Sequence, residues 1–501
     1  MAIQIFQLQY LQECYRRGIA VTTAGQVFTE DVSDFAVGLL PDVLRSMSAS
    51  DRYVRSGSWV AKGAYPPGIK VITFSHIAYC SRREKATVPY LYYSTVNELA
   101  ESGWSRNVYE DEPHVPPELF AMDNIVLAPH AAVYTPESFE ALQELTYPNK
   151  LAKNMNRKNW VFRELEGFSF RALELQMATV KEEALPLVLV HRPPNFHFPF
   201  KHRLQTHFRL LDPLDSDPPE STHSFFSRHA ASVRVLLCVD PTPITRDLLS
   251  LLPFLQLIVG SSTGVDHIDL QECRRRSIAV TNAGKAFSPD VADLAVGLLI
   301  DVLRRVSAGF QYVRAGLWAQ NGEFPLGFKL GGKRVGIVGL GSIGAEIAKR
   351  LEPFGCAISY NSRRKKPSVP FPWFKNVYDL AVNNDVLIVC CTLTEESRHI
   401  ISKDVMTALG KEGVIINVGR GALIDEKELV QLLVRGELRG AGLDVFENEP
   451  NVPQELFSLK NVVLSPHCAV ATPECFDALE ELITANLHAF FSIKPLQSVV
   501  E

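Results

Sequence analysis

Three short segments in the second half of the chain carry side chains that could bind an acid and move a proton. Arg420 lies in NVGRGALIDE, Glu449 in LDVFENEP and His467 in SPHCAVATP. The forked donors of an arginine fit a planar carboxylate, and a histidine beside a carboxylate can stay protonated near neutral pH. Each segment follows a short apolar run, and the reacting groups of open α/β sheets gather at the carboxyl ends of strands. We therefore predict that the three loops converge.

A glycine-rich turn lies between an apolar run and a helical pattern. The run at residues 335–338 leads into GLGSIG and then AEIAKRLEPFG. A strand, a G-x-G-x-x-G turn and a helix in this order predict a dinucleotide site, in which the glycines permit the turn, the approach of a pyrophosphate and close packing of the helix. The positive end of the helix favours the phosphates. The predicted cofactor-binding residues are Gly339, Gly341, Ser342, Ile343 and Gly344.

The residues about 20 positions further on indicate which dinucleotide binds. NAD enzymes place a carboxylate there for the ribose 2′-hydroxyl, whereas this chain has Ser362, Arg363 and Arg364. A hydroxyl and two guanidinium groups can bind a 2′-phosphate through charge-assisted hydrogen bonds. We therefore expect NADP(H), with NAD(H) less favoured. The alternative is that the two arginines only form a solvated loop.

Short apolar strands alternate with helical segments through most of the chain, which is typical of parallel βαβ architecture. Residues 177–180 open a first unit that contains LPLVLVHRPP, VRVLLCVD, LQLIVGSS and IAVTNA, followed by a long helix at residues 289–305. A second unit restarts after residue 331 with KRVGIVGLG, CAISYNS, DVLIVCC, GVIINVG, LRGAGLDVF and NVVLSPH. We predict two doubly wound parallel sheets, with the helical tail after residue 468 returning to the first.

The first part of the chain repeats the second part incompletely. Cys14 matches Cys273, 259 residues apart, and Ser81 matches Ser362, 281 apart. His130 matches His467, 337 apart. The first copy therefore lacks one block of 22 residues (from 259 to 281) and one of 56 (from 281 to 337). Those blocks hold the counterparts of the three glycines and of the arginine, so we expect the first copy to be catalytically inert.

Composition excludes several classes of function. The chain has 501 residues, 46% of them hydrophobic, and a formal net charge of −5 without a basic run. This charge pattern argues against nucleic acid or a membrane surface as partner. Nine cysteines without a CxxC pair fit a reducing compartment, so we expect a cytoplasmic protein with no membrane span and no metal site.

The region at residues 185–496 resembles the D-isomer-specific 2-hydroxyacid dehydrogenase family. The resemblance rests on the motifs GLGSIG, SYNSRRKK, VGRGALID, GLDVFENEP and SPHCAVATP. These motifs are similar to those of plant glyoxylate/hydroxypyruvate and hydroxyphenylpyruvate reductases. It implies that Arg420 binds the substrate carboxylate and polarises the keto oxygen. His467 would be the general acid, Glu449 would hold its imidazole, and Asp444 would lie near the nicotinamide. The turn Ser262, Thr263 and Gly264 matches the family's substrate loop.

The resemblance also implies the organisation of the whole chain. A flavodoxin-like substrate domain would comprise residues 181–305 and 468–501, and a Rossmann nucleotide-binding domain residues 306–467. A degenerate copy at residues 1–145 and a linker at 146–180 would precede them. The implied activity is NADPH-dependent reduction of glyoxylate, hydroxypyruvate or 4-hydroxyphenylpyruvate to the D-2-hydroxy acid.

Two questions stay open at this stage. The family implies a homodimer, which docking of the N-terminal copy could replace; a fused tandem duplicate or a faulty gene model would also produce the repetition. The alternative function is an NAD(H)-sensing binding protein of the corepressor type. A phosphoglycerate dehydrogenase is disfavoured by the missing aspartate at the ribose position, and a formate dehydrogenase by Glu449, where that family has glutamine.

Overall fold

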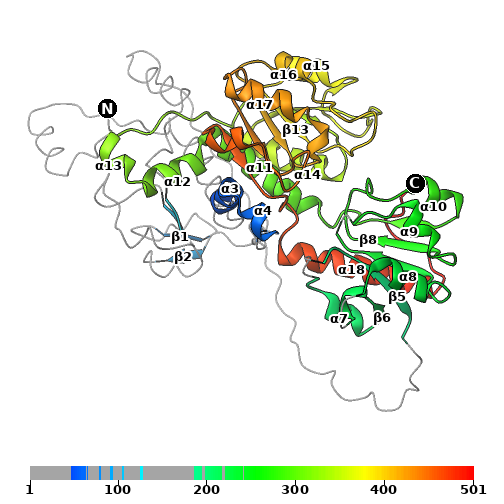
Figure 1. The fold of residues 1–501 in the computed structure, drawn as a ribbon. Helices are drawn as coiled ribbons and strands as arrows, with labels where there is room; N and C mark the ends of the chain where they lie inside the picture. Colours follow the sequence, from blue (N-terminus) through cyan, green and yellow to red (C-terminus); the bar gives the residue numbers. More distant parts are fainter. Residues whose placement is uncertain are drawn as a thin grey trace, which may run out of the picture.

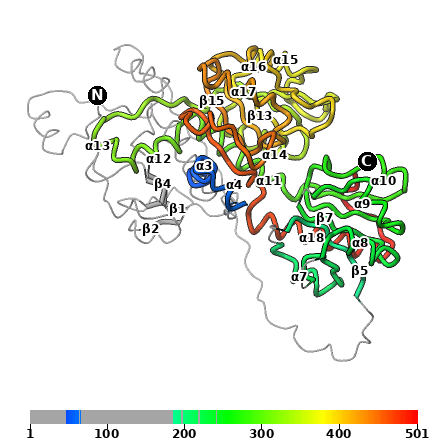
Figure 2. The backbone as a smooth tube through the Cα atoms, viewed as in Figure 1, coloured from blue at the N-terminus to red at the C-terminus, as the bar shows by residue number. Residues whose placement is uncertain are grey.

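A computed structural model describes residues 47–63, 65, 185–194, 198–216, 220–240 and 242–500, together with four short strands between residues 78 and 127 (Figure 1). The segment at residues 146–180 lies outside the described residues, and so do Cys14, Ser81 and His130. The two large units that contain β5 and β13 are joined through α11 and α18 (Figures 1 and 2).

The first unit is a five-stranded parallel sheet in the order β6-β5-β7-β8-β9. This is the 2-1-3-4-5 order of flavodoxin-like folds. The runs VLLC and LIVG are buried along their whole length, as expected for strands that are covered on both faces. The strands are β5 (Leu187–His191), β6 (Arg209–Leu211), β7 (Val235–Cys238), β8 (Leu257–Gly260) and β9 (Ala279–Thr281). The helices are α7 (Lys201–Gln205), α8 (Thr222–His229), α9 (Arg246–Ser250) and α10 (Leu270–Arg275).

The second unit is a seven-stranded parallel sheet in the order β12-β11-β10-β13-β14-β15-β16. Its first six positions follow the 3-2-1-4-5-6 order of a dinucleotide-binding fold. The strands are β10 (Arg334–Val338), β11 (Ala357–Asn361), β12 (Trp373–Phe374), β13 (Val386–Val389), β14 (Val414–Asn417), β15 (Gly440–Leu443) and β16 (Val462–Leu464). The helices are α14 (Ser342–Leu351), α15 (Val377–Val382), α16 (Lys403–Leu409) and α17 (Glu426–Val434).

Two long helices connect the units. Helix α11 (Ser288–Arg304) is buried along almost its whole length and contacts α14, β14 and β15 of the second unit. Arg350 of α14 holds Asp293 of α11 at 2.6 Å. Helix α18 (Pro473–Phe491) contacts β8, and its capping residue Thr472 donates to Asp290 of α11 at 2.7 Å. The chain therefore passes between the two units twice, and a hydrogen bond joins the start of α18 to α11.

The expected α/β architecture with two doubly wound parallel sheets is confirmed. Every strand expected from an apolar run is present, whereas the edge strands β6 and β12, of three and two residues, are too short to be expected. Sequence analysis groups α11 with the first sheet, but the helix packs on the second, because its small and branched side chains cover β14 and β15. The domain limits themselves stay a prediction.

The described part of the first copy consists of α3 (Met47–Arg55), α4 (Ser58–Lys62) and two pairs of parallel strands. The pairs are β1 (Ala78–Cys80) with β2 (Leu91–Tyr93), and β3 (Trp104–Arg106) with β4 (Ile125–Leu127). Trp104 pairs with Ile125 as Ala441 pairs with Val462, both members being shifted by 337 residues. The β3–β4 pair thus has the register of β15–β16.

Candidate active site

The glycine turn after β10 has the geometry of a dinucleotide cradle. Gly339 has a φ of +101°, and a Cβ on it would lie 2.5 Å from the backbone of Cys391. A Cβ on Gly344 would lie 2.4 Å from the carbonyl oxygen of Gly339. These two glycines are required by the turn and by the close contact of α14 with the turn.

Gly341 differs from its neighbours because a Cβ on it would meet nothing within 4 Å. It is the capping residue of α14 and supplies no side-chain acceptor for the first amides of the helix, which begins at Ser342. Open space in front of uncapped amides at the positive end of a helix suits a pyrophosphate. The residues present therefore fit a dinucleotide.

The three residues predicted to choose between the dinucleotides follow β11, directly beside β10. Arg363 and Arg364 are exposed, and the Ser362 hydroxyl donates to the carbonyl oxygen of Arg364 at 2.7 Å. The last residue of β11 is Asn361, whose amide donates to the carbonyl oxygens of Phe374 and Lys375. The end of β11 therefore carries two exposed cations and no carboxylate.

His467 and Glu449 form a hydrogen-bonded pair. The Nδ1 atom of His467 lies 2.7 Å from Oε2 of Glu449, and the other carboxylate oxygen accepts from the Phe446 amide at 3.0 Å. Burial by itself lowers the pKa of His467, but the hydrogen bond and the charge of Glu449 outweigh it and raise that pKa above its usual value. Burial opposes ionisation of Glu449, yet the bond to His467 holds the pKa of Glu449 below its usual value. The pair therefore favours a charged imidazole with Nε2 available.

Asp444 holds the turn that carries His467. The carboxylate is 1% exposed and accepts from the Ser465 hydroxyl, the Cys468 amide at 2.9 Å and the Ala469 amide at 3.2 Å. Its carbonyl oxygen accepts from the His467 amide at 2.7 Å, and His467 has a φ of +51°. These bonds fix the histidine in a backbone conformation that is rare outside glycine. The predicted contact of Asp444 with a nicotinamide stays a prediction.

Arg420 lies against the predicted substrate loop from the opposite unit. A Cβ on Gly264 would lie 2.3 Å from the Nη2 atom of Arg420, so this glycine makes room for the guanidinium. The Nε atom of Arg420 lies 3.5 Å from Asp266, and Nη1 donates to the carbonyl oxygen of Gly419 at 2.9 Å. The Ser262 hydroxyl donates to the Gly264 carbonyl oxygen at 2.7 Å and closes the loop.

The loop keeps donors available for an anion. Within the described part of the chain, the amides of Thr263 and Gly264 donate to no protein acceptor, while Asn282 donates to the Thr263 carbonyl oxygen at 2.9 Å and holds the loop in place. The positive charge of Arg420 is close enough to oppose protonation of His467. The structure therefore brings together the substrate loop, the arginine and the histidine, as the three-loop prediction requires.

Comparisons with known proteins agree with this geometry. Residues 296–469 match the D-isomer specific 2-hydroxyacid dehydrogenase, NAD binding domain. The chain is 59% identical over 316 residues to glyoxylate/hydroxypyruvate reductase HPR3 of Arabidopsis thaliana, covering 63% of this chain and 97% of that protein. It is 47% identical to hydroxyphenylpyruvate reductase of Plectranthus scutellarioides over 55% of this chain and 88% of that protein.

The chain belongs to the D-isomer-specific 2-hydroxyacid dehydrogenase family. It is an oxidoreductase that uses a nicotinamide cofactor. Among solved structures, the NADPH-dependent glyoxylate/hydroxypyruvate reductase of Sinorhizobium meliloti in complex with NADP and malonate is similar, with a TM-score of 0.58 and 35% identity. The match covers 63% of this chain and 96% of that one.

In this dehydrogenase, two further carboxylates lie at the site although sequence analysis does not select them. Asp240 follows β7, and His467 and Glu449 both act on its charge; burial is the main reason why the pKa of Asp240 is raised. Asp266 is the ion-pair partner of Arg420. Asp240 could have been found because it ends the apolar run VRVLLCVD at a strand terminus. Asp266 lies two residues beyond the selected turn and has no such signal.

The two adjacent cysteines that follow β13, Cys390 and Cys391, have the environment of packing groups. No disulfide joins any two of the seven cysteines in the described part of the chain. Cys390 donates to the carbonyl oxygen of Gly339 at 3.2 Å, and burial raises the pKa of its thiol far above the usual value. Burial likewise raises the pKa of Cys391 to about 11. Because the thiolate is the reactive form, these residues act as packing groups behind the glycine turn.

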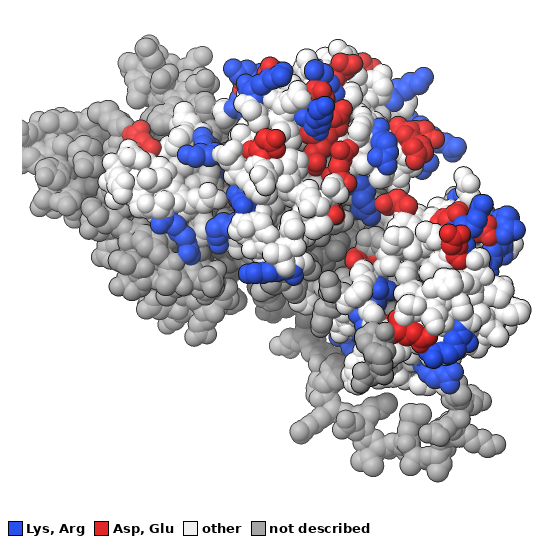
Figure 3. Space-filling model, viewed as in Figure 1, with Lys and Arg blue, Asp and Glu red and all other residues white. Residues whose placement is uncertain are grey.

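On the face shown in Figure 3, positive and negative side chains are interspersed over both units. Among the helices that the structure describes, none combines the length and the apolar character needed to cross a bilayer.

Proposed function

We propose that the chain reduces a 2-keto acid of the glyoxylate, hydroxypyruvate or 4-hydroxyphenylpyruvate type to the D-2-hydroxy acid with NADPH. The observation that carries the proposal is the His467–Glu449 pair, which lies close enough to Arg420 of the same unit to interact with its charge, while Arg420 contacts the Ser262–Gly264 loop of the other unit. A carboxylate binder beside a charged imidazole is what a 2-keto acid requires. The names of the matched reductases support the same substrate class.

Each group has a role in the reduction. Arg420 and the amides of Thr263 and Gly264 bind the carboxylate of the substrate, so that its keto oxygen lies toward His467. The glycine turn at residues 339–344 would hold the dinucleotide, and its reduced nicotinamide would be the source of the hydride that C2 of the substrate requires. His467 transfers its Nε2 proton to the keto oxygen, which becomes the hydroxyl, and is left neutral. Glu449 keeps Nδ1 as a donor throughout, and solvent later restores the Nε2 proton.

The cofactor preference rests on the end of β11. Arg363 and Arg364 are exposed beside the cradle, and the Ser362 hydroxyl is close to them. Each charge-assisted hydrogen bond to a 2′-phosphate contributes about 1.5–3 kcal/mol. The solved structure with bound NADP supports NADPH as the cofactor.

Steady-state kinetics with the three keto acids, each with NADPH and with NADH, test the proposal. We expect turnover with at least one acid and a lower KM for NADPH. Dinucleotide binding without turnover of any of them would favour the corepressor alternative.

Replacement of Ser362 by aspartate, combined with Arg363→Ser, tests the cofactor assignment. We expect the KM for NADPH to rise roughly 10–100-fold, from the loss of about 1.5–3 kcal/mol of binding energy, while NADH becomes usable. Lys411→Ala is the control, because Lys411 is an exposed cation before the amino end of β14, whereas the cofactor residues follow the carboxyl ends of β10 and β11. A double variant with an unchanged ratio of NADPH to NADH efficiency would contradict the assignment.

A further inference from the structure

Helix α3 of the first copy packs on α12 (Val306–Arg314), which is its own duplicate in the second copy. The hydroxyl oxygens of Ser48 and Ser307 lie 3.1 Å apart, and the two serines are 259 residues apart in the chain. That separation is the spacing of the repeat, which also relates Cys14 to Cys273. Equivalent residues that face each other are a property of contacts made across a two-fold axis.

The contact is also reciprocal. Helix α3 lies on β16, and α12 lies on β4. Strand β4 is the counterpart of β16, because Ile125 and Val462 have the 337-residue separation of His130 and His467. Each helix therefore rests on the last described strand of the other copy, as in an isologous interface.

The segment that contains α3 and α4 has the same local structure as its counterpart in the second copy, which begins with α12. The Tyr53 hydroxyl donates to the Gly63 carbonyl oxygen at 3.0 Å, and the Tyr312 hydroxyl donates to the Gly322 carbonyl oxygen at 3.2 Å. The ring of Tyr53 lies 5.2 Å from that of Tyr65, and the ring of Tyr312 lies 5.3 Å from its counterpart Phe324. The first copy has thus kept the shape of this element although it has lost the cofactor turn.

Apolar side chains bury the contact. Met47 and Val54 of α3 are 1% and 2% exposed. Trp59 of α4 is also buried and meets the ring of Phe446 edge-on at 5.7 Å. Val54 and Trp59 belong to the apolar core on one face of the seven-stranded sheet. Such burial is typical of a permanent interface rather than of a loose surface contact.

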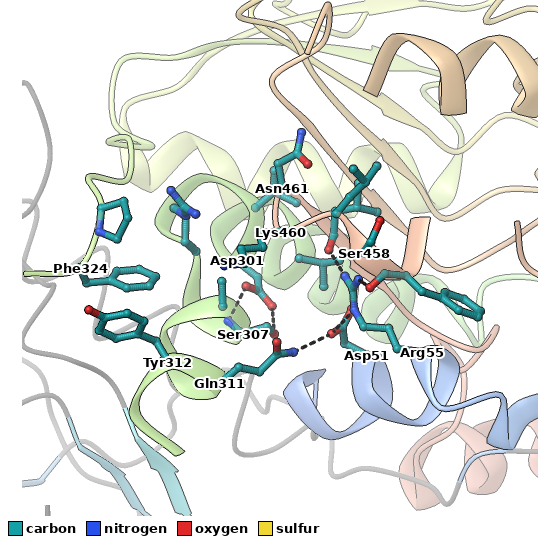
Figure 4. A pocket seen from close by; sticks show the side chains of 18 of the residues that line it. Asp51, Arg55, Asp301, Ser307, Gln311, Tyr312, Phe324, Ser458, Lys460 and Asn461 are labelled. Carbon is teal, nitrogen blue, oxygen red and sulfur yellow. Dashed lines mark hydrogen bonds and ion pairs between the residues drawn. The ribbon is translucent and has the colours of Figure 1, made fainter. Parts of the chain in front are cut away.

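Polar groups fix the orientation of α3 (Figure 4). Arg55 donates to the carbonyl oxygens of Leu456 at 3.0 Å, of Phe457 at 2.6 Å and of Val462. Asp51 holds Arg55 at 2.7 Å and accepts from the Leu464 amide at 3.0 Å. Asp51 is 1% exposed, and its counterpart is Phe310, so the first copy differs from the second at this position. The aspartate allows α3 to bind the backbone of β16.

We propose that α3 and α4 act as a built-in second subunit: they cover the face formed by α12 and β16, which a second copy of this chain would otherwise cover. The occupant is the chain's own residues 47–62, bound in cis. The interface face of the catalytic unit is consequently covered by residues of the same chain, and the protein is a monomer in solution. The inference does not depend on the substrate or on the cofactor preference.

The mass of the full chain in solution is the first test. Light scattering coupled to size exclusion should give 55.8 kDa over a wide range of concentration. Twice that mass would overturn the proposal, whether a second copy displaces α3 or α3 binds in trans.

Disulfide trapping is the second test and uses the facing serines. The double variant Ser48→Cys with Ser307→Cys should form a bond within one chain, seen as a linked peptide from a band of monomer mass on a non-reducing gel. Ser307→Cys alone is the matched control. If two catalytic copies faced each other, this single change would place two identical thiols together and give a covalent dimer, which would overturn the proposal.

Release of α3 is the third test. In Arg55→Glu, a carboxylate would face three carbonyl oxygens, so α3 should leave the face and allow concentration-dependent dimers to form. Lys62→Glu is the control, because Lys62 is an exposed charge at the end of α4. A variant Arg55→Glu that stays monomeric at every concentration would show that α3 does not occupy a self-association face.

Discussion

At the scale of single residues, the site depends on how one carboxylate changes one imidazole. His467 is partly buried, which disfavours its charge, and Glu449 reverses that effect through a bond of 2.7 Å. Asp444 contributes differently, because its carboxylate is bound by the turn and positions the backbone of His467. Glu449 is thus the main cause of the raised pKa of His467, and Asp444, whose charge adds to that effect, fixes the position of the histidine.

Glu449→Gln should move the pH dependence of the reaction. Reduction needs protonated His467, so its rate is high below the pKa of His467 and is lost as the pH rises through that pKa. Glutamine removes the charge that raises the pKa of His467, so we expect the falling limb of kcat/KM to move to lower pH. Glu447→Gln is the control, since Glu447 pairs with His399 instead. A falling limb that does not move would show that Glu449 has only a structural role.

Site residues that lie at strand ends within recognisable sequence motifs can be predicted from the sequence. Arg420, Glu449, His467 and the 262–264 turn are brought together as predicted. Asp240 and Asp266 were missed because their relevance comes from neighbours across the two units, which no local pattern records. The buried environment of Asp444 was missed for the same reason, since the amides of Cys468 and Ala469 surround it only after the turn has formed.

At the scale of elements, the turn from β10 into α14 contains two glycines that are needed for different reasons. Gly344 is required for packing, because a Cβ there would lie 2.4 Å from a carbonyl oxygen, while Gly341 borders open space. The strand, turn and helix were predictable from their pattern. The packing of α11 on the second sheet was not, because an apolar helix fits either sheet and only the surrounding surfaces decide.

Alanine substitutions at these two glycines should have opposite effects. Gly344→Ala should cost about 1–3 kcal/mol of stability through overpacking and lower the apparent Tm. Gly341→Ala should leave the Tm unchanged and raise the KM for NADPH at least about tenfold, equivalent to ~1.4 kcal/mol, because its methyl group occupies the space for the pyrophosphate. Thermal melts and cofactor titration of both variants check this. Equal melting temperatures for the two would contradict the division of roles.

At the scale of the whole molecule, the sequence contains two equivalent histidines, His130 and His467, but only one complete set of cofactor-binding and substrate-binding groups. The cradle, Arg420 and the 262–264 loop all lie in the second copy, and the blocks that are missing from the first include the counterparts of the cradle and of Arg420. The described part of the first copy includes α3, which contacts α12 and β16, and β4, which contacts α12. Loss of the chemistry and retention of the contact surface indicate that the first copy has a role in assembly.

The two equivalent histidines provide the test of this division. His467→Ala should lower kcat by about 10²–10⁴-fold, the usual contribution of a general acid, because His467 is, among the described residues, the one titratable side chain that is hydrogen-bonded to Glu449. His130→Ala, 337 residues earlier and outside the described residues, should leave kcat and KM unchanged, because the first copy has no counterpart of the glycine turn or of Arg420 beside it. Turnover with the preferred keto acid and NADPH measures both variants under the same conditions. A comparable loss in His130→Ala would mean that the first copy contributes to catalysis, and that the repeat contains a second active site rather than a second interface.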